Sequence, residues 1–282
     1  MFQKVLVANR GEIAIRVFQG CRERGIETVA VHSEADRTAP HRFAADESFL
    51  LGPAAPTESY LRVDRLLEAA RHTGADAIHP GYGFLAENAD FARAVEAAGL
   101  VFIGPTPEQI KSMGDKVRAR ELMKAASVPV IPGTENPIDN EEDLKTAAAE
   151  IGYPLLLKAA GGGGGKGIRR VDSDADLIPF WERTRSEAKA SFGDDRVYIE
   201  RLVQNAKHIE AQVVGDGHGS VWFLGERECS LQRNHQKILE ESPSPAIDEE
   251  MRKKFREAAV SGAAALNYRG AGTMELLYDG AR

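Results

Sequence analysis

From residue 1 to about residue 105, short apolar runs alternate with amphipathic stretches, and this alternation constrains the fold more than any other feature. VLVAN, TVAVHS, ADAIHP and LVFIGP read as buried strands. Between them, GEIAIRVFQGCRERG and RLLEAARHTG carry apolar residues at helical spacing, and Gly74 stands where the second helix should end. Strands that alternate with helices are typical of a parallel sheet with helical crossovers. This part of the chain is predicted to be α/β.

The remainder of the chain has a different pattern. A helical stretch at 106–130 leads into IPGTENPIDN, a turn-rich connection after which Asp139 and Asn140 are candidate helix caps. PLLLKAA, KGIRRV, VYIERLV, HIEAQVV, SVWFLGE and TMELLY then read as strands, and DEEMRKKFREAAVSGAAALNYRG reads as a capped helix. An α+β unit is therefore predicted to follow the α/β unit.

Composition excludes several classes of protein. The chain has 282 residues and a net charge of −7, so it lacks the basic footprint of a nucleic-acid-binding protein. No apolar run approaches membrane-spanning length, and the apolar run in MFQKVLVANRGE is too short for a signal peptide. Cys21 and Cys229 match no metal or disulfide spacing. A cytoplasmic location, with neither a nucleic acid nor a membrane as partner, is expected.

KAAGGGGGKGIRR contains five consecutive glycines and allows three interpretations. The first is a flexible linker, although strand-like residues adjoin the run on both sides. The second is a P-loop, which fails because Ala160 replaces the first glycine and Gly167 replaces the Ser or Thr that would bind magnesium. The third is a flap between two antiparallel strands, whose bare backbone N–H groups cover the phosphates of a nucleotide.

Seven stretches together resemble the amino-terminal part of a biotin carboxylase, a member of the ATP-grasp superfamily. They are KVLVANRGEIAIR, HPGYGFLAEN, FIGP, MGDK, IGYPLLLKAAGGGGGKG, ERECSLQRNHQK and YRGAGTMELLYD, and they span nearly the whole chain. The resemblance implies a Rossmann-like domain at 1–110, a helical connection at 111–130, an ATP-grasp lid with the glycine flap at 131–204, and an incomplete C-terminal ATP-grasp subdomain at 205–282.

The resemblance also assigns roles to individual residues. It implies that ATP is bound by Lys116, Lys158, Gly164, Gly165, Glu200, Arg201, Leu202, Val203, His208, Gln232 and His235. The backbone at 200–203 would contact the adenine edge. Lys237 would be catalytic and would meet bicarbonate or the transferring phosphate, Glu275 would bind magnesium, and Tyr82 and Gly83 would lie beside the biotin ring.

Local sequence alone weighs these residues differently. Lys158 ends an apolar strand, where an unpaired ammonium is costly to bury, so a phosphate partner is expected. HIEAQVV places His208, Glu210 and Gln212 on one face, which reads equally well as a solvated sheet face. ERECSLQRNHQK by itself reads as a solvated loop. Glu275 interrupts an apolar strand and suits a hard cation, or merely lies on the wet side of the sheet.

The function that the resemblance implies is ATP-dependent carboxylation of biotin through carboxyphosphate. Its substrates and cofactors would be ATP, bicarbonate, Mg²⁺ (with Mn²⁺ as the alternative) and biotin borne on a carboxyl carrier protein. A carboxyltransferase and a second copy of the chain would be further partners. Asp279 and Gly280 signal a hairpin whose returning strand bears further catalytic groups in the family, so this chain alone is expected to turn over slowly or not at all.

Two rival functions remain open at this point. One is another ATP-grasp ligase, such as a carbamoyl-phosphate synthetase half, which would form an acyl phosphate without biotin. The other is a non-catalytic nucleotide-binding module. The final acyl acceptor belongs to the carboxyltransferase and cannot be predicted from these residues.

Overall fold

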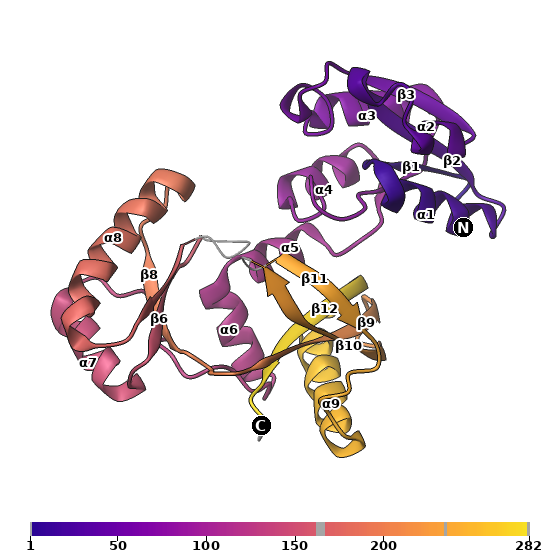
Figure 1. Ribbon diagram of the computed structural model, residues 1–282. Helices are drawn as coiled ribbons and strands as arrows, with labels where there is room; N and C mark the ends of the chain where they lie inside the picture. The colour runs from indigo at the N-terminus through magenta and orange to yellow at the C-terminus, as the bar shows by residue number, and fades with distance from the viewer. Residues whose placement is uncertain (1, 162–166, 234–235, 281–282) are drawn as a thin grey trace. The chain divides into compact units, whose positions relative to one another are not determined.

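The computed structural model describes residues 2–161, 167–233 and 236–280, apart from the side chain of Lys116. The chain divides into two compact units, Met1–Lys111 and Ser112–Arg282 (Figure 1). The first is an α/β unit and the second an α+β unit, as the sequence predicts. No helix within the described ranges is both long and apolar enough to cross a membrane.

The first unit is built on a five-stranded parallel sheet of order β3-β2-β1-β4-β5. Its strands are β1 (Lys4–Val7), β2 (Glu27–Ser33), β3 (Glu47–Gly52), β4 (Ala77–His79) and β5 (Val101–Phe102). Its helices are α1 (Gly11–Arg22), α2 (Pro40–Ala44), α3 (Val63–Thr73) and α4 (Ala89–Ala97), with short 3₁₀ turns η1 (Glu34–Asp36) and η2 (Pro56–Glu58); α5 (Pro107–Gly114) crosses the boundary between the units. Gly74 ends α3 in the left-handed conformation, as predicted.

Helices cover both faces of this sheet. Successive residues of each strand point to opposite sides, so both sets of side chains are buried. Val5 and Val7 pack with Phe18 of α1 on one side. Leu6 packs with Leu66 of α3 and with residues of α4 on the other side. β1 lies between β2 and β4, so the chain leaves it toward one edge of the sheet and later returns on its other side. The carboxyl ends of β1 and β4 therefore form a topological switch point, where open α/β sheets bind ligands.

The second unit contains two antiparallel sheets. The smaller has the order β7-β6-β8 and consists of β6 (Leu155–Ala159), β7 (Ile168–Val171) and β8 (Val197–Arg201). It packs against α7 (Glu141–Ile151) and α8 (Asp174–Phe192). Asn140 caps α7, because its side-chain oxygen accepts a 2.9 Å hydrogen bond from Asp143 N. β6 alternates between a buried face with Leu155 and Leu157 and a face that bears Lys158.

The larger sheet has the order β11-β10-β9-β12. Its strands are β9 (Lys207–Asp216), β10 (Val221–Arg233), β11 (Gln236–Glu241) and β12 (Arg269–Tyr278), and α9 (Glu249–Ala265) covers one face while α6 (Lys116–Ala125) packs against α9. Ala211 and Val213 of β9 are buried against Ala259 and Ala263 of α9. The apolar half of the alternation in HIEAQVV thus faces the helix, which leaves the polar half on the opposite face.

Candidate active site

The polar face of the larger sheet collects charged side chains from all four strands. Strand register pairs Glu210 of β9 with Arg227 of β10 and with Glu275 of β12. His208 lies two residues before Glu210 on the same face of β9. Lys237 of β11 contacts Glu210 on this face. Side chains directly opposite each other on antiparallel strands approach closely, so the register itself brings these groups together.

Glu210 is the buried centre of this group. Its carboxylate accepts a 2.6 Å hydrogen bond from Arg227 Nη2 and a second one from the Lys237 ammonium. Arg227 also donates a 2.9 Å bond to Gln212 Oε1. A buried carboxylate is stable only when cations or other donors satisfy it, and here two cations do so. The alternation of β9 places Glu210 on the correct face, but nothing in the local sequence distinguishes it from a solvated glutamate.

Glu275 lies at the more exposed side of the group. Its Oε1 is 3.2 Å from Lys237 Nζ and 3.7 Å from His208 Nδ1. The neighbouring imidazole of His208 and then the Lys237 charge lower the pKa of Glu275 to about 2, so it is a carboxylate at neutral pH. His208 Nδ1 is buried and has no hydrogen-bond partner among the described residues. The carboxylate remains half-exposed, with oxygens that can reach a ligand.

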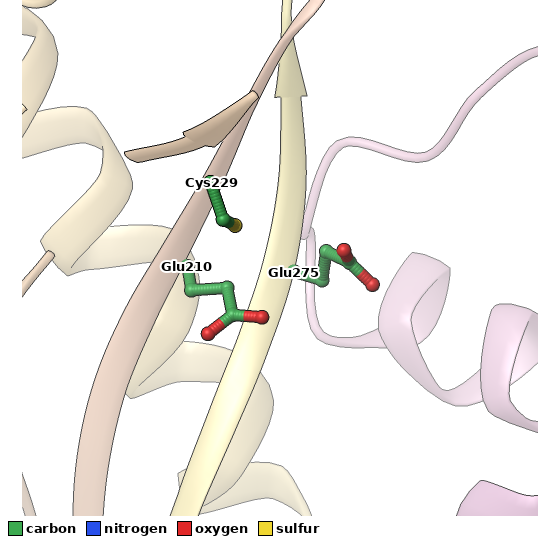
Figure 2. Close-up of side chains that lie close together, drawn as sticks. All are labelled: Glu210, Cys229 and Glu275. Carbon is green, nitrogen blue, oxygen red and sulfur yellow. The ribbon is translucent and has the colours of Figure 1, made fainter. Parts of the chain in front are cut away.

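Potential metal ligands from three strands meet beside this group. One ligand atom each from Glu210, Cys229 and Glu275 lies within 4.8 Å of the others (Figure 2). Burial, followed by the charges of Glu275 and Glu240, raises the pKa of the Cys229 thiol to about 11. A thiol sulfur is also a soft ligand, whereas a hard cation prefers oxygen. The two carboxylates remain, and they suit a hard cation such as Mg²⁺ rather than zinc.

A second ionic group lies on the smaller sheet. The Lys158 ammonium donates to Glu200 Oε2, and Arg120 Nη1 of α6 donates a 2.8 Å hydrogen bond to Glu200 Oε1. The Glu200 side chain is 9% exposed. The expectation that the Lys158 ammonium is unpaired without a phosphate is therefore wrong. A carboxylate on the adjacent strand already provides the counter-charge.

The backbone at 201–203, from the last residue of β8 onward, is only partly available to a ligand. Arg201 N donates a 2.8 Å hydrogen bond to Pro132 O, and Leu202 N donates a 3.2 Å bond to Pro154 O. Val203 N donates no hydrogen bond to any residue that the structure describes. Of these three N–H groups, only that of Val203 can be donated to the edge of a base without breaking an existing bond.

The structure leaves four predicted residues partly or wholly undescribed. Gly164, Gly165 and His235 lie outside the described residues, and so does the side chain of Lys116, whose backbone begins α6. Gln232 of β10 pairs with Lys237 of β11, and its Nε2 donates a 2.9 Å bond to Cys229 O. ERECSLQRNHQK is thus not a loop: within the described ranges it forms the end of β10 and the start of β11.

Tyr82 and Gly83 belong to the first unit, in the loop that follows β4. Gly83 has a φ of +65°, and Tyr82 is 62% exposed. The loop therefore lies at the carboxyl edge of the parallel sheet, where the sequence predicts a ligand site.

Two family models match the chain in succession. "Biotin carboxylase, N-terminal domain" covers residues 1–110, and "Carbamoyl-phosphate synthase L chain, ATP binding domain" covers residues 115–282.

Curated relatives match over the same length. The biotin carboxylase of Pseudomonas aeruginosa is 52% identical over 100% of this chain and 63% of its own length. Biotin carboxylase 1 of Bacillus subtilis is 52% identical over 99% of this chain and 62% of its own length. The chain thus spans somewhat less than two thirds of these relatives.

Solved structures agree with the fold. A biotin carboxylase from Campylobacter jejuni, described as a β-γ-ATP complex, has a TM-score of 0.95 and 46% identity over 99% of this chain and 63% of that one. The biotin carboxylase domain dimer of the 2-oxoglutarate carboxylase from Hydrogenobacter thermophilus, in complex with MgADP, ADP and bicarbonate, has a TM-score of 0.92 and 48% identity over 99% of this chain and 61% of that one.

Proposed function

Because this chain belongs to the biotin carboxylase family, we propose that it supports the ATP-dependent carboxylation of biotin with bicarbonate. A bicarbonate oxygen bonds to the γ-phosphorus of ATP while the bond from that phosphorus to the bridging oxygen breaks, and ADP leaves. The resulting carboxyphosphate splits into carbon dioxide and phosphate. The ureido nitrogen of biotin then bonds to carbon dioxide and gives its proton to the released phosphate. The observation that best supports this proposal is the convergence of Glu210, Lys237 and Glu275 on one sheet face.

We assign the divalent cation to Glu275 together with Glu210. The two carboxylates offer the oxygen ligands that Mg²⁺ or Mn²⁺ prefers, and the protonated Cys229 thiol does not compete for a hard ion. When bound, the cation supplies charge neutralisation at the phosphate oxygens, which is a large part of catalysis in phosphoryl transfer.

We assign bicarbonate, or the transferring phosphate, to Lys237. An ammonium has three donors, and two of them are directed at Glu210 and Glu275. The third donor has no partner among the described residues and is left for an anion. The adjacent carboxylates hold the ammonium in place, so its charge is oriented before any substrate arrives.

The rest of the nucleotide site draws on both sheets. We propose that Lys116 and Lys158 contact phosphate and that the flap glycines Gly164 and Gly165 cover it. His208, Gln232 and His235 would neighbour the ribose and phosphates. Among the residues at 200–203, the available N–H of Val203 favours it as the donor to the adenine edge, and Glu200, Arg201 and Leu202 would shape the pocket around it.

We propose that Tyr82 and Gly83 lie beside the biotin ring. The ring would arrive on a biotin carboxyl carrier protein, and a carboxyltransferase would consume the product. A homodimer is a further proposal, supported by the dimer named for the Hydrogenobacter domain. The acyl acceptor belongs to the carboxyltransferase.

Two measurements on the purified chain test the proposal. Calorimetry should show binding of Mg-ADP that weakens in Lys158→Ala. Release of ADP from ATP should depend on both bicarbonate and free biotin, and comparison with a full-length relative in the same assay tests the expectation of low turnover. Absence of Mg-ADP binding would refute the proposal.

The match of residues 115–282 to a carbamoyl-phosphate synthase domain supports one alternative function, that of an ATP-grasp ligase that acts without biotin. A ligase that forms an acyl phosphate without biotin would release ADP at a rate that biotin does not change. A nucleotide-binding module without catalysis would bind Mg-ADP and release none. Biotin-dependent release therefore excludes both rivals, and release that biotin does not change favours the ligase without biotin.

A further inference from the structure

The segment Asn9–Glu12 has no role in the function proposed above. Its side chains nevertheless reach the loop at 80–84, directly from Asn9 and Glu12 and through two further side chains from Arg10. We propose that Asn9, and Arg10 acting through Asp36 and Tyr60, are positioning residues that hold the 80–84 loop in the conformation that receives the biotin ring. The assignment of biotin to this loop rests on the proposed function. The positioning itself rests on contacts within the first unit.

Asn9 holds the first half of the loop. Its Nδ2 donates a 2.8 Å hydrogen bond to Pro80 O and a 2.7 Å bond to Tyr82 O. Its Oδ1 accepts a 2.9 Å bond from Arg10 N. Asn9 is 4% exposed, so every polar atom of its side chain is used in a buried setting. The carboxyl end of β1 is thereby joined to the segment that follows β4.

The backbone of the loop approaches Asn9 so closely that only glycine fits. Gly81 has a φ of +67°, and a Cβ built on it would lie 2.6 Å from Asn9 Nδ2. Two carbonyl groups separated by one residue can converge on a single amide only because the chain turns sharply at this position. Asn9 and Gly81 therefore define one tight fit.

Arg10, which is itself partly exposed, holds the second half of the loop through two buried side chains, those of Asp36 and Tyr60. Its Nε and Nη2 donate hydrogen bonds of 2.8 and 2.5 Å to the two carboxylate oxygens of Asp36. Tyr60 OH donates a 2.7 Å bond to Asp36 Oδ2. The Tyr60 ring stacks on Phe84, with centroids 5.1 Å apart and planes inclined by 6°. Arg10 thus holds Asp36, Asp36 holds the Tyr60 hydroxyl, and the Tyr60 ring packs against Phe84 of the loop.

The loop needs such support because its own backbone is unfavourable. Gly81, Gly83 and Phe84 all have positive φ, and the value for Phe84 is +41°. A bulky side chain in that region costs about 1–3 kcal/mol and persists only where its surroundings impose it, commonly at binding sites. Tyr82 is held at its tip, where its hydroxyl donates to Glu12, while most of its ring stays exposed to solvent. The loop is rigid in its backbone and open on its outer surface.

The first test measures the loop itself. Asn9→Asp preserves the shape of the side chain but cannot donate to Pro80 and Tyr82, and Tyr60→Phe removes the bond to Asp36 while keeping the ring. Arg62→Gln is the control, because Arg62 forms an exposed pair with Asp64. Hydrogen exchange of peptides covering 80–86 should accelerate about tenfold or more in Asn9→Asp, as expected for two lost hydrogen bonds, and remain unchanged in the control.

The second test measures substrate binding on the full chain. In biotin-dependent ADP release, both loop variants should raise KM for free biotin several-fold and leave KM for ATP unchanged, whereas a loss of overall structure would move both. Unchanged exchange at 80–86 in both loop variants, or equal changes in the two KM values, overturns the positioning role. If wild-type ADP release occurs but ignores biotin, the proposed function is wrong. With such release, or with none at all, the exchange data alone decide whether Asn9 and Tyr60 hold the loop. Should Asn9→Asp fail to fold, Tyr60→Phe carries both tests.

Discussion

Lys237 Nζ lies 3.2 Å from Glu275 Oε1, and the same ammonium donates to Glu210. One cation therefore joins carboxylates from two adjacent strands, β9 and β12. Arg227 supplies the second positive charge at Glu210. The group carries two carboxylates and two cationic side chains, so their charges cancel. A bound dication or anion must change this net charge.

Replacing Glu275 should weaken Mg-ADP binding more than the binding of metal-free ADP. Glu275→Gln removes a charged oxygen ligand but retains the size of the side chain, so we expect about a tenfold or greater loss of Mg-ADP affinity, in line with the 1.5–3 kcal/mol typical of bonds to charged groups. Calorimetry with and without magnesium measures the difference. Glu250→Gln on the exposed surface of α9 is the control. Equal losses with and without the metal would remove Glu275 from the cation site.

The ion pair between Asp36 and Arg10 should make the free energy of unfolding depend on pH in the acid range. Hydrogen bonds from Arg10 are the largest cause that lowers the pKa of Asp36 from 3.8 to about 2. Because the pKa of Asp36 is lower in the folded state, its ionised form stabilises the fold at pH values above 3.8, the pKa in the unfolded chain. This stabilisation is lost as the pH falls toward about 2. At neutral pH Asp36→Asn should lower the free energy of unfolding by about 2 kcal/mol.

The test is denaturant unfolding of wild type and Asp36→Asn across acid pH. The difference between them should shrink between pH 3.8 and about 2. Asp64→Asn provides a matched control, because the pKa of Asp64 is also lowered to about 2 by an arginine, yet its side chain is exposed and should matter less. A constant difference across this range would contradict the role given to Asp36.

Lys158 and Glu200 should be energetically coupled. Lys158→Met leaves the buried Glu200 carboxylate with Arg120 as its remaining ionic partner among the described residues, so the free energy of unfolding should fall by about 1–3 kcal/mol. Adding Glu200→Gln should cost less than the sum of the two single changes, because the carboxylate that needed the lysine is gone. Denaturant unfolding of the three variants measures this. Strict additivity would show that the pair contributes nothing.

Cys229 should react slowly with thiol reagents at neutral pH. Burial and the adjacent carboxylates raise the pKa of its thiol from 9.0 to about 11, which reduces the thiolate about a hundredfold. In a Cys21→Ser background, labelling should be slow in the folded protein and fast after denaturation. Cys229→Ser should bind Mg-ADP as the wild type does. Weakening as large as that in Glu275→Gln would instead identify sulfur as a metal ligand.

The alternation of the sequence predicts most strands but misses two. β3 (Glu47–Gly52) and β11 (Gln236–Glu241) are absent from the prediction, and both lie at the edge of their sheets. Edge strands are half-exposed and carry charge, which protects them from pairing with other chains. β11 is mostly exposed, so its composition resembles that of a loop. Its partner β10 decides that it is a strand.

The site shows the same division. Alternation in HIEAQVV places His208, Glu210 and Gln212 on one face, but only the register with β10 and β12 singles out Glu210 as the centre of the charged group. The same limit explains the error over Lys158. Its local sequence shows an ammonium at the end of an apolar strand and contains no sign of Glu200, 42 residues away.

Most strands and helices, the buried and polar faces of strands such as HIEAQVV, and a helix cap such as Asn140 follow from the sequence itself, because they depend on residues within one or two turns of each other. The helices α2 and α8, like the strands β3 and β11, are not predicted. The partners of each charge do not. Asn9 meets Tyr82 across 73 residues, and Lys237 meets Glu210 across 27. Such pairs are set by strand order and register, which arise when the whole chain buries its apolar surface at once, and only the tertiary structure reveals them.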